Sequence, residues 1–216
     1  MSEQVAKEKK PFDAKSFFTN KKNIFSMVGV LFGILAVVLF LVLPVVQISL
    51  TPEGVALASK NAATIPDMAS YHEVLGGAKV LFGNGSYNVW INSGTSAYLK
   101  TEQMAFNVPL LIGLIFVLAA SIALLVMLIL KKNNIINKFI LGLFVLGAVV
   151  LILTPVWFYM VNPIVASTRY DTSATIYPYG SVNAHGEIGM ILSAAFAIIS
   201  CVASGMLIVK KDDKAR

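Results

Sequence analysis

The sequence has little charge and almost no cysteine. Only 13% of its 216 residues are charged, against 57% that are hydrophobic, and the mean hydropathy is +0.78. This balance is typical of a polytopic membrane protein. The single cysteine, Cys201, excludes a disulfide within the chain. Any folded segment outside the membrane must therefore hold its shape without one.

Charge is absent from four long apolar segments. None of them contains Asp, Glu, Lys, Arg or His: 24–46, 106–130, 139–161 and 188–209. A helix of 23 residues is about 34 Å long, enough to cross a hydrocarbon core of about 30 Å. We therefore predict an all-α membrane protein, a bundle of four transmembrane helices. Asn107 and Pro109 stand where the second helix is expected to begin.

The same absence bears on function. Proton- or ion-coupled transporters place ionisable residues in the membrane along their path, and these spans have none. The sequence also lacks a glycine-rich phosphate loop and the CxxC, HExxH and GxSxG motifs. We predict a protein that is not an enzyme and has no cofactor.

The basic residues set the orientation. Of the 17, only Lys60, Lys79, Lys100 and Arg169 lie between the predicted spans on one side. The others lie in the tails 1–23 and 210–216 or the connector 131–138, so both termini are predicted to be cytoplasmic, in the cell (plasma) membrane. This topology accounts for the net charge of +6 without a nucleic-acid partner. Trp157 and Tyr159 fit an interfacial aromatic belt at the outer end of the third span.

Two outer loops remain, 47–105 and 162–187. The first is expected to hold a three-stranded β-meander over 78–100, with strands at 78–82, 86–92 and 95–100 and a hairpin turn at Asn84-Gly85. Residues 174–177 of the second loop are a further candidate strand, and the meander is expected to pack on the helix ends or pair with this loop. Aromatic residues of both loops are predicted to form a partner surface: Tyr87, Trp90, Tyr170, Tyr177 and Tyr179. The alternative is that these loops rest on the bilayer.

Small side chains recur every four residues along the fourth span: Gly189, Ser193, Ala197, Cys201 and Gly205. Gly29 and Gly33 form a shorter pair in the first span. Such residues let helices approach closely in lipid. We expect packing within the chain's own bundle, and oligomerisation through one of these faces is the alternative.

His185 and Glu187, just before the fourth span, are weak polar candidates for a site. His72 and Glu73 in the first outer loop could join them as metal ligands. No third ligand is evident nearby, so we predict no metal and interpret these as ordinary interfacial polar residues.

The layout resembles that of the claudin-like four-span (tetraspan) membrane proteins. Four spans with both ends inside, a long β-rich first outer loop, a short inner connector and a shorter second outer loop carry this resemblance. The resemblance implies a tryptophan in the first loop, for which Trp90 is the match. The family's Gly-Leu-Trp and paired cysteines are absent, so its junctional function does not carry over.

These features predict an integral membrane protein that acts by contact, as an accessory or scaffold subunit or an adhesion protein. Its partners are the lipid bilayer and either another membrane or envelope protein or a second copy of itself. The alternative is a small oligomeric channel or passive transporter, lined by Ser193, Ser200, Ser204 or Thr154.

Overall fold

The computed structural model of the chain describes residues 19–50, 72–92, 97–130, 135–162, 175–176 and 182–212. The predictions for the N-terminal tail, the inner connector, most of the second outer loop and the last residues lie wholly or partly outside this part of the chain. Tyr170, Tyr177 and Tyr179 are among the residues not described.

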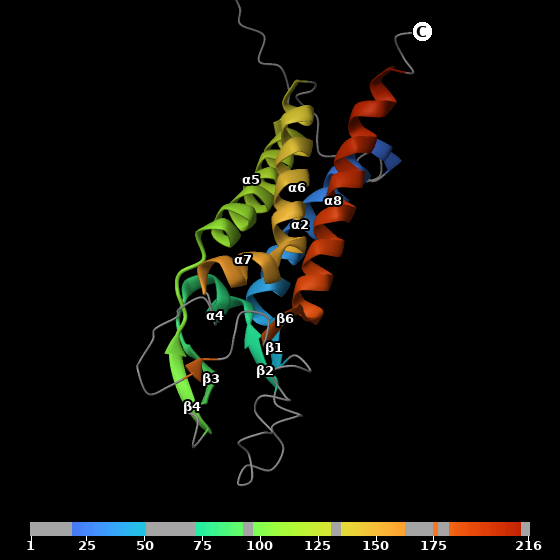
Figure 1. Cartoon of the computed structure of the whole chain (residues 1–216). Helices are drawn as coiled ribbons and strands as arrows, with labels where there is room; N and C mark the ends of the chain where they lie inside the picture. Colours follow the sequence, from blue (N-terminus) through green and yellow to red (C-terminus); the bar gives the residue numbers. More distant parts are fainter. Residues whose placement is uncertain are drawn as a thin grey trace, which may run out of the picture.

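Four long helices lie side by side (Figure 1): α2 (Lys21–Val42), α5 (Val108–Leu130), α6 (Ile135–Ile152) and α8 (Ile188–Asp212). Helices α2 and α6 each contact both α5 and α8. Helix α2 begins and α8 ends at one end of this helical part, which we call the terminal end, and the strands lie at the opposite sheet end. Three helices, α2, α5 and α8, are long and apolar enough to cross a membrane, and α6 together with α7 (Thr154–Val161) makes a fourth if the bent pair counts as one span.

Asparagine caps and a proline set the helix ends. The Asn20 side chain accepts a hydrogen bond from the Lys22 backbone N–H at 3.0 Å, so α2 begins three residues before the predicted Ile24. Asn107 caps α5 as predicted, with its Oδ1 accepting from the Leu110 N–H at 3.2 Å. The first span was predicted to reach Val46, but α2 ends at Val42. Leu43 is extended because the following Pro44 disfavours the helical conformation at the residue before it.

The predicted third span is broken. Helices α6 and α7 are inclined at 65° to one another across Leu153. Pro155 has no N–H for the Leu151 carbonyl, and the Thr154 hydroxyl donates to that carbonyl instead, at 2.6 Å. The Trp157 indole donates to the Val150 carbonyl at 3.1 Å. The Leu151 and Val150 carbonyls at the break therefore each accept from a side chain.

The strands form two sheets. The first sheet has the order β2-β1-β6, made by β1 (Pro44–Leu50), β2 (His72–Gly76) and β6 (Val182–Gly186). The second has the order β4-β3-β5, made by β3 (Ser86–Asn92), β4 (Ala97–Gln103) and β5 (Thr175–Ile176). All pairs are antiparallel. Each sheet thus joins strands from both predicted outer loops, and β5 confirms the candidate strand at 174–177.

The predicted meander is correct for β3 and β4 and wrong for residues 78–82. These belong to a short helix, α4 (Gly77–Phe82). Gly83, with a φ of +63°, ends this helix in the left-handed conformation that glycine adopts without strain. The Asn84-Gly85 pair therefore lies between α4 and β3 and does not form the predicted hairpin turn.

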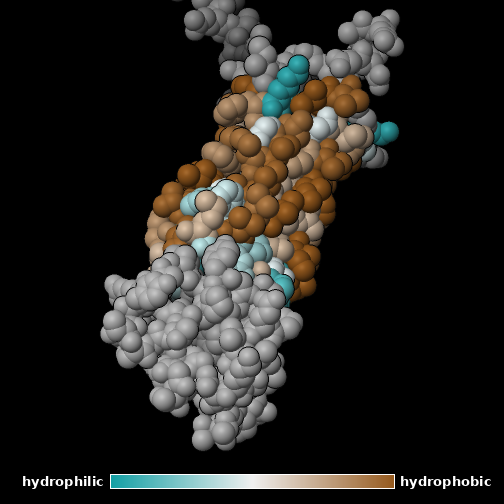
Figure 2. All heavy atoms as spheres, viewed as in Figure 1, coloured by the Kyte–Doolittle hydropathy of each residue, from teal (hydrophilic) through white to brown (hydrophobic). Residues whose placement is uncertain are grey.

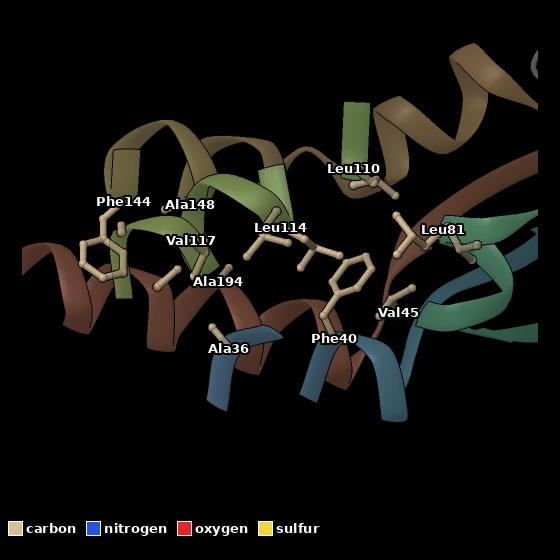
Figure 3. Close-up of a cluster of buried hydrophobic side chains, with 14 of the residues drawn as sticks. Ala36, Phe40, Val45, Leu81, Leu110, Leu114, Val117, Phe144, Ala148 and Ala194 are labelled. Atoms are coloured by element: carbon tan, nitrogen blue, oxygen red, sulfur yellow. The ribbon is translucent and has the colours of Figure 1, made fainter. Parts of the chain in front are cut away.

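The core runs without interruption from the helices into the sheet end (Figure 3). Phe40, Leu114 and Phe144 fill the space between the helices. Val45 of β1 and Leu81 of α4 extend this core into the sheet end. Of these five side chains, Leu114 is 5% exposed and the others 2% or less. The strands and α4 are therefore packed onto the helix ends rather than tethered to them.

Candidate functional site

The first sheet has one largely apolar face and one polar face. In antiparallel strands, directly opposed residues share a face and successive residues alternate. The registers place Val46, Ile48 and Leu75 on one face, and each is at most 2% exposed. The other face, which we call the polar sheet face, carries Gln47, Ser49, His72, Val74 and His185.

The helices hold this sheet with its polar face outward. Strand β1 contacts α4, α7 and α8, which cover the apolar side. The Glu187 backbone N–H donates to the Val45 carbonyl at 3.0 Å, and the Ala184 N–H donates to the Tyr159 hydroxyl of α7. On the polar sheet face, the side chains of His72 and His185 are exposed, and Val74 is 47% exposed.

The two histidines lie on the same face of the sheet, but they are not aligned with one another across the three strands. His185 lies across from Gln47, which lies across from Val74, whereas His72 lies across from Ser49. Because strands are about 4.8 Å apart, two strand spacings alone place the histidine Cα atoms roughly 10 Å apart. Among the residues that the structure describes, no group of three His, Cys, Asp or Glu could hold a metal ion.

The two glutamates predicted beside these histidines lie elsewhere. Glu73 points to the opposite face of the sheet from His72, because the two are consecutive in β2. Glu187 follows β6 and precedes α8. The arrangement offers imidazole, amide and hydroxyl groups for hydrogen bonding to a surface.

The aromatic residues predicted as a partner surface are divided. Tyr87 is 4% exposed, and its ring packs edge-on against Phe158 of α7, with centroids 6.2 Å apart. The structure thus places Tyr87 in the core, where it joins the second sheet to the helices. Trp90 pairs with Leu99 in the middle of β3 and β4.

The small residues of α8 and α2 lie largely inside the chain. Gly189 packs so closely on Leu43 and Pro44 that a Cβ there would meet the Pro44 carbonyl oxygen at 2.4 Å. Gly29 and Gly33 pack equally closely on Leu124 and Ser121. The other four residues of the α8 stripe differ in burial. Ser193 and Ala197 are fully buried, whereas Cys201 and Gly205 are half-buried. The first three positions of the stripe and both α2 glycines therefore serve packing within the chain.

Two of the four hydroxyls predicted to line a pore donate to carbonyls of their own helix. Ser193 donates to the Gly189 carbonyl at 2.6 Å, and Ser200 donates to the Phe196 carbonyl at 3.1 Å. Thr154 is the group that satisfies the break between α6 and α7. Ser204 is buried next to Gly29, and its hydroxyl has no hydrogen-bond partner among the described residues. These groups sit among packed side chains.

The sequence did not indicate which residues join the strands and α4 to the long helices. Asn162, at the end of α7, accepts a hydrogen bond from the Ala105 N–H just before α5. The backbone N–H of Asn107 donates to the Leu81 carbonyl of α4 at 2.9 Å. Tyr159 was assigned to the interfacial belt and in fact also binds β6. Comparison of the chain with protein-family models, curated proteins and solved structures finds no significant match to any of them.

Proposed function

We propose that the chain is a four-span protein of the cell membrane that acts by contact, as an accessory or scaffold subunit or as an adhesion protein. The observation that carries this proposal is the polar sheet face, which the ends of the helical part hold in a fixed orientation. The partner would be another membrane or envelope protein, or a second copy of the chain.

Lipid is the environment that the helical surface requires. Large apolar side chains exposed by more than a third lie along all four long helices, for example Leu31, Leu118, Val145 and Val202. Figure 2 shows this surface as a broad apolar belt, with polar residues toward its ends. So much exposed apolar area on a water-soluble protein would be an aggregation hazard, whereas in a bilayer it is solvated.

The broken helix fits a fourth span. Helix α6 has 18 residues and is about 27 Å long, close to the thickness of the hydrocarbon core. Backbone groups freed by a break in a membrane span need other partners, and the Leu151 and Val150 carbonyls accept from the Thr154 hydroxyl and the Trp157 indole.

The charges favour a cytoplasmic terminal end. Lys21 and Lys22 begin α2, Lys138 lies in the first turn of α6, and the last turns of α8 contain Lys210 and Lys211. The described sheet end has Lys79 in α4 and Lys100 in β4, so the positive-inside rule favours a cytoplasmic terminal end with the sheets outside.

Affinity capture from mild detergent tests the contact function. We would purify the tagged full chain from its own host, together with the variants Val74→Arg, in the polar sheet face, and Asn84→Arg, an exposed site before β3. A stoichiometric partner, or a second copy, should accompany the wild type and the Asn84 variant and be lost from the Val74 variant. Recovery of the wild type as a monomer without any partner would contradict the proposal.

A channel or passive transporter is the weaker alternative. Ser193 and Ser200, two of the four residues that would line it, donate to carbonyls of their own helix, and apolar side chains fill the space between the helices. Solute or ion flux through liposomes that contain the purified chain would reverse this preference.

A further inference from the structure

Exposed apolar side chains continue beyond the long helices onto α4 and α7. Phe82, the last residue of α4, is 53% exposed, and Phe106, just before α5, is 44% exposed. Their ring centroids lie 6.5 Å apart. On α7, Val156 is 47% and Met160 67% exposed. These four residues, which we call the foot, lie at the junction of the helices with the sheets.

The bend turns α7 away from the direction of α6. Its eight residues make a helix about 12 Å long, and at 65° to α6 its far end advances only about 5 Å along that axis. If α6 crosses the bilayer, α7 therefore runs more along the membrane surface than through it. Val156 and Met160, one turn apart, then lie at nearly the same depth.

Helix α7 has an inner and an outer stripe. Thr154 and Phe158 are fully buried, and Phe158 packs on Tyr87 of β3. Val156 and Met160 are two residues out of step with them and so lie on the opposite side of the helix. The outer stripe is apolar as well, so it also needs an apolar environment.

We infer that the foot lies in the interfacial region of the outer leaflet and is covered by phospholipid. This inference depends on the membrane location proposed above. The occupant follows from continuity, because Phe106 adjoins Val108 and Val156 follows Leu153, exposed apolar residues at the ends of the lipid-facing belt. Phe side chains on the apolar face of an interfacial helix are buried at the boundary between headgroups and acyl chains. Lys79, exposed on the same short helix as Phe82, extends a flexible cation that can reach a lipid phosphate.

The position of the foot determines the height of the two sheets above the bilayer. Helix α4 is bonded to the start of α5 through the Leu81 carbonyl, and α7 is packed on β3 through Phe158. Lipid that holds α4 and α7 at the interface therefore also sets the height of both sheets. The polar sheet face is then offered to a partner at a constant distance from the bilayer.

Nitroxide depth measurements test this inference. Single cysteines would be placed in a Cys201→Ala background by Phe82→Cys and Met160→Cys, spin-labelled, and reconstituted in vesicles of phosphatidylcholine and phosphatidylglycerol. Asn84→Cys, two residues from Phe82 and exposed, is the matched control outside the foot, and Leu118→Cys, 40% exposed within α5, marks the middle of the belt. Relaxation by oxygen and by a water-soluble nickel chelate reports the depth of each label.

Labels at 82 and 160 should favour oxygen over the nickel chelate, at depths between that of 118 and that of 84. Nickel accessibility at 82 and 160 equal to that at 84, with 118 still shielded, would overturn the foot and leave the membrane location intact. Nickel accessibility at 118 as well would overturn the membrane location, and the foot with it. Circular dichroism of each variant checks that the helices persist.

Discussion

At the scale of single residues, two neighbouring glycines have opposite environments. A Cβ on Gly77 would lie 1.6 Å from the Phe40 carbonyl oxygen, which is backbone and cannot turn aside, whereas a Cβ on Gly76 would meet nothing within 4 Å. We predict that Gly77→Ala destabilises the protein by about 1–3 kcal/mol through overpacking. Gly76→Ala should stay within about 0.5 kcal/mol of the wild type. Thermal unfolding in detergent, followed by circular dichroism, compares them, and equal midpoints would contradict this packing.

Residue chemistry also shows what the sequence could predict. Asn107 was expected to cap a helix, and it does so because its short side chain reaches an N–H of the first turn wherever a helix begins. Tyr87 was expected on the surface because the aromatic residues of the outer loops were predicted to bind a partner. Its burial depends on Phe158, which is 71 residues away in the chain and reaches it only through the bend of α7. Local chemistry was therefore predictable, and the contact between distant segments was not.

At the scale of elements, the boundaries between helices and strands could not be predicted within uniformly apolar segments. Residues 44–46 continue the apolar pattern of α2 but form the start of β1. Without a polar period, a buried strand and a buried helix look alike in sequence. Residues 78–82 form a helix although their composition favours a strand, since Gly83 ends them in a helix-terminating conformation. The first sheet joins strands from both outer loops, and such non-local pairing leaves no signal in either segment alone.

Helix α7 contacts the second sheet through the ring of Phe158. Phe158→Ala would remove a fully buried ring that packs on Tyr87 and should cost about 3–5 kcal/mol. We expect faster hydrogen exchange at the amides of β3 (Ser86–Asn92), measured by mass spectrometry, because β3 loses its contact with the helices. Met160→Ala, on the exposed side of the same helix, is the control and should leave β3 protected. Unchanged exchange in the Phe158 variant would show that α7 does not support the sheet.

At the scale of the whole molecule, one arrangement explains the helix lengths, the lysines and the sheets together. Each of the three uninterrupted spans is at least 22 residues long, lysines begin or end α2, α6 and α8 at the terminal end, and both sheets lie at the other end (Figure 1). The four apolar segments were predictable because crossing lipid demands an unbroken stretch of about 20 apolar residues. The packing of the sheets on the helices was not predictable, because it depends on the ends of four separate helices lying together.

This arrangement predicts that β6 and the start of α6 are accessible to reagents from opposite sides of the membrane. In a Cys201→Ala background, His185→Cys on the polar sheet face should react with a membrane-impermeant thiol reagent on intact cells, because that face lies outside. Lys138→Cys, exposed in the first turn of α6, should react only after permeabilisation, because the basic end stays in the cytoplasm. Gel-shift labelling measures both, and the Cys201→Ala chain alone gives the background. Labelling of position 138 but not 185 on intact cells would invert the topology, and the polar sheet face would then have to find its partner in the cytoplasm.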